Sequence, residues 1–372
     1  MVYLFYRNLQ NKLLQWKIEN YTHIYIGIIL LIIFIIILLI IRINYKNNSN
    51  NDNNYYNDII IRHKEKFDAP TYKNLISNWD NGSGFYSELN FKLNHYLYCK
   101  KYNINFKTNS DNWPYKYNNG WTDYFQNIEL NLNSDFNNND TNLIHTESGC
   151  CINLEQFKLK DYVNIIPEYY KYTPEVEKII NNKKQELGLN NGEYGCIYIR
   201  RGDKLVNEIE FTHSDKFIDK LLNVYPDCKT IFLQTDDYNC FIDLLNYIKE
   251  KNLNIKPITL CPDTNFGAIA HSGWANQMKE NTNANKEYLD KINKNLSKPI
   301  SEMTLDEKYA HTIELITSVD ICINSKFCIC DYKSNISRFI KVAHKNVMNV
   351  FDIGEGDKFF NLESYKSIGF DF

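Results

Sequence analysis

The second half of this chain is built from blocks in which hydrophobic residues recur at helical or strand spacing. Thr173, Pro174 and Gly188 have the residue types of a helix N-cap, a first helical position and a helix stop, so they predict a helix over residues 174–187. The apolar face of this helix is expected to consist of Val176, Ile179, Ile180 and Leu187. The apolar run at residues 196–199 then predicts a strand.

Two polar clusters follow predicted strands at the same relative position. Residues 200–204 come directly after the first strand, and residues 235–237 come after a second strand at residues 230–233. The predicted helix between them, residues 214–224, has an apolar side of Phe217, Ile218, Leu221 and Leu222. Because open α/β sheets bind ligands at the carboxyl edge of their parallel strands, both clusters suit a binding site. Asp236 and Asp237 could instead cap the next helix, and we expect one of the two to be functional.

The alternation of helices and strands continues toward the end of the chain. Thr304 and Glu307 have the spacing of a capping box, which predicts a helix start. The apolar residues of that helix are Ile313, Leu315 and Ile316. Residues 319–323 and 347–351 are expected to be strands, and another helix is expected to begin near Ser334. This succession predicts an α/β fold with a doubly wound parallel sheet.

The N-terminal part contains a candidate membrane span. Residues 24–41 carry no charge and are mostly Ile and Leu, which is close to the minimum length of a spanning helix. No cleavage site of small residues follows, so we expect an uncleaved signal anchor with a short cytosolic N-terminus and a lumenal catalytic domain, typical of Golgi or ER-type secretory membranes. The expected parts are a tail (1–23), the anchor (24–43), an Asn-rich stem (44–57), an N-terminal α/β half (58–190) and a C-terminal nucleotide-binding half (191–372).

The composition excludes several classes of protein. With 44% hydrophobic residues, 23% charged residues and a net charge of -3, the 372-residue chain is neither disordered nor a strongly basic nucleic-acid binder, and we expect no nucleic-acid partner. The ten cysteines include no pair of CxxC motifs, so we expect no zinc site. If the domain is lumenal, Cys322 with Cys328 or Cys330 is the expected local disulfide.

A diphosphate would have to be bound by arginine and a helix end, because the sequence has neither a P-loop nor a GxGxxG dinucleotide motif. Arg200 is the best candidate, since a guanidinium fork matches phosphate geometry and stays charged. The alternative for this residue is a surface ion pair with Asp203. The helix near Ser334, with Arg338 in its first turns, supplies a candidate helix end.

The segment 198–204, Tyr-Ile-Arg-Arg-Gly-Asp-Lys, with Glu208 beyond it, resembles the donor-binding motif of the α-1,6-fucosyltransferase family. That family includes the core fucosyltransferase of N-glycans and the bacterial Nod-factor fucosyltransferase. Further segments resemble the family in the same order, namely residues 110–125, 169–172, 232–237 and 334–338. The resemblance covers residues 84–351.

The resemblance implies a GT-B-like fold of two Rossmann-like halves and transfer of L-fucose from GDP-fucose to a glycan or oligosaccharide acceptor, α-1,6 to GlcNAc. By position, Arg200 would bind the diphosphate, Lys204 would act at the sugar and the acceptor, and Glu208 would be the general base. The other positions matching the donor site are Tyr115, Tyr198, Arg201, Asp203, Asp236, Asp237, Ser334 and Asn335.

The implied reaction is an inverting, in-line displacement in which Arg200 and the helix at Ser334 stabilise the leaving diphosphate, with neither a metal nor a cofactor besides the donor. Two positions depart from the family: Tyr198 stands where the family has His, and near Thr312, where it has Asp, the nearest carboxylate is Glu314. Both family residues help to hold guanine. The alternatives are a related O-fucosyltransferase, a transferase for another nucleotide sugar, and an inactive, membrane-anchored glycan-binding relative.

Overall fold

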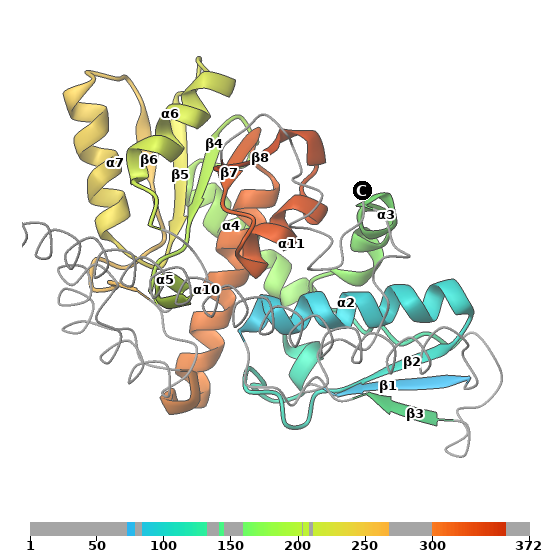
Figure 1. Cartoon of the computed structure of the whole chain (residues 1–372). Helices are drawn as coiled ribbons and strands as arrows, with labels where there is room; N and C mark the ends of the chain where they lie inside the picture. Colours follow the sequence, from blue (N-terminus) through green and yellow to red (C-terminus); the bar gives the residue numbers. More distant parts are fainter. Residues whose placement is uncertain are drawn as a thin grey trace, which may run out of the picture. The chain divides into compact units, whose positions relative to one another are not determined.

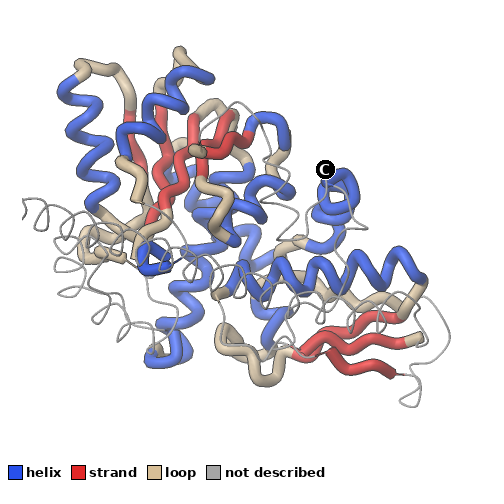
Figure 2. The backbone as a smooth tube through the Cα atoms, in the orientation of Figure 1, coloured by secondary structure: helices blue, strands red, loops and turns tan. Residues whose placement is uncertain are grey.

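The computed structural model describes residues 73–78, 84–131, 141–144, 159–202, 204–207, 211–267 and 300–354. All of them belong to one compact unit of the chain and form two parallel β-sheets with covering helices (Figure 1, Figure 2). Within these ranges, no helix is long and apolar enough to cross a membrane. The expected anchor at residues 24–43 and the stem at residues 44–57 lie outside the described residues and stay predictions.

The first sheet has three parallel strands in the order β2-β1-β3. Its strands are β1 (Asn74–Asn78), β2 (Asn105–Asn109) and β3 (Thr141–Ile144). Helix α2 (Phe85–Tyr102) connects β1 to β2, and Asn103 ends it in the left-handed conformation, with φ 56°. Helix α3 (Leu159–Tyr169) packs against α2. This part of the chain therefore contains a parallel βαβ unit, as expected for an α/β half.

The second sheet has five parallel strands in the order β6-β5-β4-β7-β8. The strands are β4 (Gly195–Ile199), β5 (Thr230–Thr235), β6 (Lys256–Ile258), β7 (Phe327–Cys330) and β8 (Val350–Asp352). The helices around it are α4 (Pro174–Leu187), α5 (Lys204–Asn207), α6 (Ser214–Val224), α7 (Asn239–Glu250), α10 (Leu305–Ile323) and α11 (Asn335–Ala343). The described 3-10 turns are η1 (Gly120–Asp123), η5 (Ile300–Glu302) and η6 (Val347–Asn349). The predicted doubly wound parallel sheet is thus confirmed.

Strand β4 separates two hydrophobic cores by simple alternation of its side chains. Ile197 and Ile199 pack in a core with the apolar residues of α6 and α7. Cys196 and Tyr198 point to the other face and join the core that contains residues of α10 and α11. The latter core also includes Leu75 of the first sheet, so both sheets contribute side chains to one hydrophobic core.

The predicted helix ends of α4 are confirmed, but its apolar face is narrower than expected. The Thr173 hydroxyl accepts a hydrogen bond from Val176 N at 3.3 Å, and Gly188 ends the helix at φ 73°. Val176 and Ile180 are buried, whereas Ile179 is 39% exposed. The prediction for Ile179 was wrong, because the face of α4 that meets the core contains Val176, Ile180 and Leu187 and excludes it.

The strand expected at residues 319–323 does not exist. Helix α10 continues to Ile323, and the strand follows at β7. All seven residues from 317 to 323 are buried, so this end of α10 lacks the polar stripe that identifies a helix in sequence. At the last expected strand, residues 347–349 form η6 and pairing begins only at Val350.

The described cysteines are free thiols, and the contact of Cys322 differs from the expected one. Its Sγ lies 3.1 Å from Sγ of Cys196 on β4, and both residues are fully buried. The expected disulfide partners, Cys328 and Cys330, both lie on β7. The approach of Cys196 to Cys322 is a tertiary contact between residues 126 positions apart, which local spacing could not predict.

Candidate functional site

The carboxyl ends of β4 and β7 mark the switch point of the second sheet. From β4 the chain builds the sheet outward through β5 and β6, and then returns to the other side of β4 with β7 and β8. Open α/β sheets bind ligands at this point, because the loops after the two neighbouring strands run in opposite directions and leave a crevice. Arg200 directly follows β4, and Ser334 lies in the connection from β7 to α11. The sequence-predicted cluster therefore lies at the expected edge.

Arg200 and Arg201 lie on opposite faces of the sheet. Arg200 is partly exposed and lies on the α10 side, where its charge acts on His311. Arg201 is 2% exposed, its guanidinium lies 4.4 Å from the ring centre of Phe211, and its Nη2 donates a hydrogen bond to the Thr212 carbonyl. Arg200 is thus the arginine available to a ligand, and Arg201 fixes the segment before α6.

Asp236 connects both arginines to the end of β5. Its Oδ2 forms an ion pair with the Arg200 guanidinium, and its Oδ1 accepts a hydrogen bond from Arg201 N at 2.7 Å. The two side chains of the ion pair are 12% and 14% exposed, so water screens the pair only partly. Asp236 therefore orients Arg200 before any ligand binds.

Asp237 has the structural role that the sequence left open for one of the two aspartates. Its Oδ1 accepts hydrogen bonds from Asn239 N at 3.0 Å and from Asn239 Nδ2 at 2.9 Å, at the start of α7. The residue is 1% exposed. We conclude that Asp237 fixes the turn before α7 and that Asp236 faces the site.

The N-terminus of α11 is joined to β4 by a buried hydrogen bond. The hydroxyls of Tyr198 and Ser334 lie 3.2 Å apart, and burial raises the pKa of Tyr198 although the charge of Arg200 opposes this. Asn335 Oδ1 accepts a hydrogen bond from Arg338 Nη1, and the Asn335 carbonyl accepts one from Asn90 Nδ2 of α2 at 2.9 Å. The helix end is thus held from both the second sheet and the first helix layer.

Arg338 is occupied by its own loop. Its Nε donates to the Tyr332 carbonyl at 3.0 Å and its Nη2 donates to the Lys333 carbonyl at 3.2 Å. With the bond to Asn335, these contacts shape the turn before α11. Arg338 therefore acts as a scaffold for the helix end and is no longer our candidate for anion binding.

Tyr115 lies in the aromatic core of the first layer. Its hydroxyl accepts a hydrogen bond from Phe85 N at 3.0 Å, at the start of α2, and the residue is 6% exposed. Trp113 and Trp121 are also buried. A donor contact by Tyr115 stays a prediction, and it would require this side chain to be uncovered.

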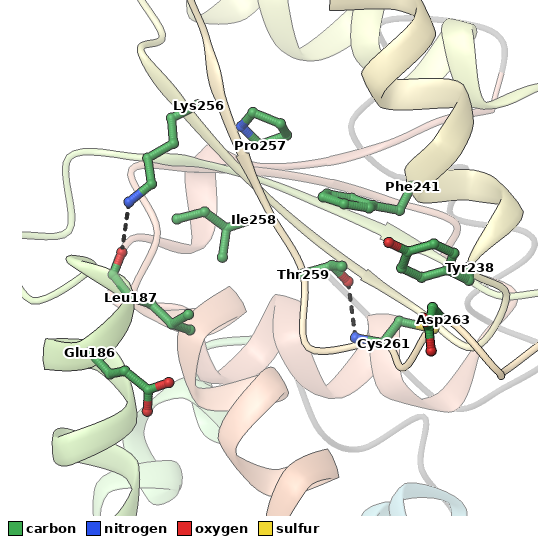
Figure 3. Close-up of a pocket in the computed structure, with 10 residues that line it drawn as sticks. All are labelled: Glu186, Leu187, Tyr238, Phe241, Lys256, Pro257, Ile258, Thr259, Cys261 and Asp263. Carbon is green, nitrogen blue, oxygen red and sulfur yellow. Dashed lines mark hydrogen bonds between the residues drawn. The ribbon is translucent and has the colours of Figure 1, made fainter.

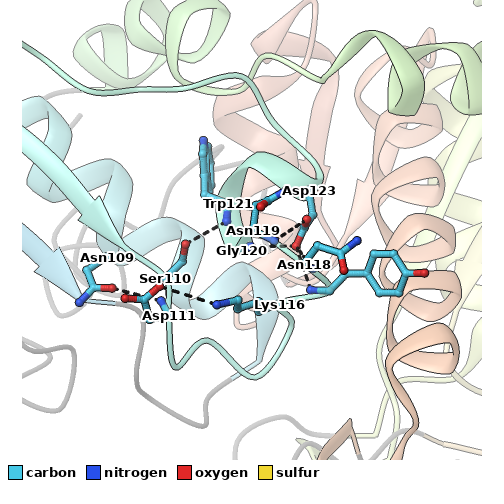
Figure 4. Close-up of polar contacts among 10 residues, drawn as sticks. Asn109, Ser110, Asp111, Lys116, Asn118, Asn119, Gly120, Trp121 and Asp123 are labelled. Carbon is cyan, nitrogen blue, oxygen red and sulfur yellow. Dashed lines mark hydrogen bonds and ion pairs between the residues drawn. The ribbon is translucent and has the colours of Figure 1, made fainter.

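The loop that contains these aromatics is organised by one carboxylate (Figure 4). Asp123 accepts hydrogen bonds from four consecutive backbone N–H groups, those of residues 117–120, at 2.8 to 3.0 Å. Gly120 has φ 79°, and a Cβ there would lie 2.1 Å from Ser110 Oγ. Ser110 Oγ in turn accepts a hydrogen bond from Trp121 N at 3.1 Å. Glycine at position 120 is therefore required by the local backbone.

This loop contacts the first half of α10. Tyr117 Oη donates a hydrogen bond to Asp306 Oδ1 at 3.0 Å, and its ring lies 4.6 Å from the ring of Tyr309. Tyr124 also stacks on Tyr309, with ring centres 5.7 Å apart. The loop thus positions the part of α10 that precedes His311.

His311 is a site residue that the sequence analysis missed. Although the residue is exposed, protein atoms around its imidazole displace part of the water. This desolvation and the charge of Arg200 hold the pKa of His311 below the usual range, so it is neutral at pH 7. A neutral imidazole can both donate and accept a hydrogen bond. The histidine itself was visible in the sequence, but the face of α10 that meets Arg200 was not.

At the two positions that depart from the family, Tyr198 and Thr312, the side-chain hydroxyl is already hydrogen-bonded within the protein. Neither hydroxyl is therefore available to a guanine base. Thr312 is buried, and its hydroxyl donates to the Lys308 carbonyl at 2.7 Å. Tyr198 is bonded to Ser334, as described above. Glu314 is exposed, but protein atoms around its carboxyl displace part of the water. This desolvation raises the pKa of Glu314, although the charge of Lys183 opposes the shift.

Three of the predicted catalytic and donor residues lie in or beside the short helix α5. Lys204 begins α5, whereas Asp203 and Glu208 lie outside the described residues. Gly202, before the helix, has φ 60°. The roles of Lys204, Asp203 and Glu208 stay predictions. Among the described residues, no group of three or more His, Cys, Asp and Glu side chains is arranged to hold a metal ion.

No protein-family model matches the chain, and neither does any curated protein. Among solved structures, the chain is similar to a crystal structure of NodZ alpha-1,6-fucosyltransferase soaked with GDP-fucose, with a TM-score of 0.44 and 10% identity. The alignment covers 73% of this chain and 93% of that one. We therefore base the functional proposal on the residues of this chain.

Proposed function

We propose that the chain is an inverting glycosyltransferase that moves L-fucose from GDP-fucose to a glycan hydroxyl, in α-1,6 linkage to GlcNAc. The observation that carries this proposal is the position of Arg200. It is the arginine of the family-like motif that faces α10, at the switch point of a doubly wound sheet. A nucleotide bound there would present its diphosphate to a preoriented guanidinium.

Arg200 would act on the leaving group. Negative charge grows on the diphosphate as the glycosidic bond breaks, and a fixed cation stabilises that charge more in the transition state than in the ground state. The ion pair with Asp236 keeps the guanidinium in place but also competes with phosphate for its donors. The N-terminus of α11, held by Ser334 and Tyr198, would supply a second source of positive potential.

The acceptor hydroxyl needs a base, and Glu208 is the proposed one. A carboxylate within hydrogen-bond reach of the hydroxyl can take its proton as the new bond forms. Lys204 would stand near the same sugar. The cationic side chains would replace a metal ion in this mechanism, and the donor is the one small molecule besides the acceptor that the reaction needs.

The proposal is tested with the purified full-length chain in detergent. We expect GDP to bind more tightly than UDP or ADP in calorimetry, and fucose to be released or transferred from labelled GDP-fucose in the presence of EDTA. Tighter binding of UDP would favour another nucleotide sugar. Nucleotide binding without any turnover, over a panel of N-glycan, chitooligosaccharide and protein acceptors, would favour the inactive relative. Activity lost with EDTA and restored by manganese would overturn the metal-free mechanism.

A further inference from the structure

A hollow of about 500 Å³ lies along β6, at the open edge of the second sheet (Figure 3). It extends from the end of α4, at Glu186 and Leu187, across β6 to the start of α7 at Tyr238 and Phe241. Asp263, after the end of β6, completes its lining. The size is within the range of ligand pockets in proteins.

The outer edge of β6 is unsuited to pairing with a further strand. Lys256 N donates to the Lys229 carbonyl, so Lys256 and Ile258 point their backbone groups toward β5, and Pro257 points outward. Proline has no N–H group, so the outer edge lacks the donor that strand pairing needs. A ligand in the hollow would therefore be recognised by side chains.

One wall of the hollow is aromatic. The rings of Tyr238 and Phe241 lie 5.6 Å apart with an angle of 49° between their planes, and both are half-buried. They are placed by the start of α7, where Asp237 accepts a hydrogen bond from Asn239 N. Such rings offer a rigid apolar surface to the C–H groups of a ligand.

The charged groups of the lining are of mixed sign. Glu186 forms an ion pair with Lys183 at 2.7 Å, and Lys256 Nζ donates to the Leu187 carbonyl at 3.4 Å. Asp263 is exposed at the opposite end of the hollow. The carboxylates of Glu186 and Asp263 can accept hydrogen bonds from the hydroxyl groups of a ligand, and the Lys256 ammonium can donate hydrogen bonds to them.

We propose that this hollow binds a neutral saccharide, as a subsite for the acceptor glycan at a distance from the reacting sugar. Aromatic rings beside carboxylates and an ammonium group match the alternating C–H and hydroxyl surfaces of a sugar. The assignment of the saccharide as the acceptor rests on the proposed function. Binding of a saccharide in the hollow does not depend on transfer.

The hollow is connected to the proposed donor site through the end of β5. Tyr238 follows Asp236 and Asp237 in the chain, and Cys261, which also lines the hollow, is close enough for the charge of Asp236 to raise its thiol pKa further, beyond the effect of burial. The hollow and the proposed donor site thus border the same strand end.

The test measures saccharide binding directly, with a fluorescent chitooligosaccharide and a fluorescent N-glycan core as probes for the full-length chain. We expect Phe241→Ala and Asp263→Asn each to weaken binding by about tenfold, the loss of one aromatic contact or one hydrogen bond to a charged group. The matched controls are Leu245→Ala, on an exposed position of α7, and Glu177→Gln, on an exposed position of α4. The affinity for GDP should stay within about twofold in all four variants.

Three results are decisive. If neither probe binds the parent chain at millimolar concentration, or if the hollow variants bind as the controls do, the inference is wrong. If the probes bind through Phe241 and Asp263 but GDP does not bind, the saccharide site stands and the proposed transferase function fails. Asp263→Asn keeps the test valid should Phe241→Ala lower the stability of α7, because Asp263 is exposed.

Discussion

Arg200 and Arg201 are neighbours in the chain, yet one faces a candidate ligand site and the other is 2% exposed beneath the opposite face of the sheet. The single carboxylate of Asp236 contacts both, through the side chain of the first and the backbone of the second. Their substitution should therefore lower the affinity for GDP to different extents.

We expect Arg200→Ala to lower the transfer rate on the order of 10²-fold or more, because the leaving diphosphate loses its cation. It should also lower the melting temperature, because Asp236 loses its partner in a largely buried ion pair. Arg200→Lys should recover part of this loss, since it keeps the charge but not the fork. Arg201→Ala should destabilise the fold by about 2 to 4 kcal/mol through the lost carbonyl and ring contacts. Calorimetric GDP affinity and thermal unfolding of the three variants check this. Equal losses of GDP affinity in both alanine variants would contradict it.

Asp123→Asn should destabilise the aromatic loop. An amide has one acceptor oxygen in place of the two that receive four N–H groups, so we expect a loss of about 1 to 3 kcal/mol. The control is Asp111→Asn in the same loop, whose carboxylate is 82% exposed and lies 3.7 Å from Lys116 Nζ; its loss should be within about 1 kcal/mol. Urea unfolding measures both, and equal effects would refute the role of Asp123.

Stability should fall with acid below the pKa of an unfolded histidine, about 6.5. Burial, and then the charge of Lys92, hold the pKa of His95 well below that value in the fold. Between the two pKa values the unfolded chain binds a proton that the folded chain does not, so the stability present above pH 6.5 is lost as pH falls, by up to about 1.4 kcal/mol per pH unit for this group. His311 and His344 also have lowered pKa values and act in the same direction.

Unfolding free energies at pH 7.5, 6.5 and 5.5 test this dependence. His95→Gln should be less stable at pH 7.5, because it loses the contact of Nδ1 with Ser77 Oγ at 2.7 Å, but its stability should depend less steeply on pH. If the stability of His95→Gln depended on pH as steeply as that of the parent chain, the pKa of His95 would be the same in the folded and unfolded states.

Glu208→Gln separates the proposed base from a solvated loop carboxylate. The amide keeps the shape of the side chain but cannot accept a proton, so we expect nearly unchanged GDP affinity and transfer lowered by about 10²-fold to 10⁴-fold. Single-turnover transfer and calorimetry on the same protein make the comparison. Transfer at the parental rate would withdraw the assignment, and loss of GDP binding would leave the base unassigned.

Helix ends could be predicted from sequence where the signal is local. Thr304 and Glu307 form both bonds of the predicted capping box, and Thr173 with Gly188 bounds α4 as expected. These motifs depend on residues three or four apart, so no tertiary information is needed. The alternation of helices and strands also predicted the position of Arg200. A residue that directly follows a parallel strand lies at the carboxyl edge of the sheet.

The missed features depend on which surfaces meet in the fold. The end of α10 was taken for a strand because burial on all sides removes the helical stripe at Val319 and its neighbours. The role of His311 depends on the nearby charge of Arg200. The contact of Cys322 likewise depends on Cys196, which is distant in the sequence. The hollow along β6 is likewise assembled from three separate elements.

Helix α10 has a mechanical consequence for the proposed enzyme. It is one unbroken helix of 19 residues, about 28 Å long, with Tyr309 against the aromatic loop near one end and Asp320 ion-paired to Lys184 at 2.8 Å near the other. A rod held near both ends, with its last seven residues buried, keeps its place in the core. We expect His311, which lies between the two anchors, to keep the same position whether or not a ligand is bound.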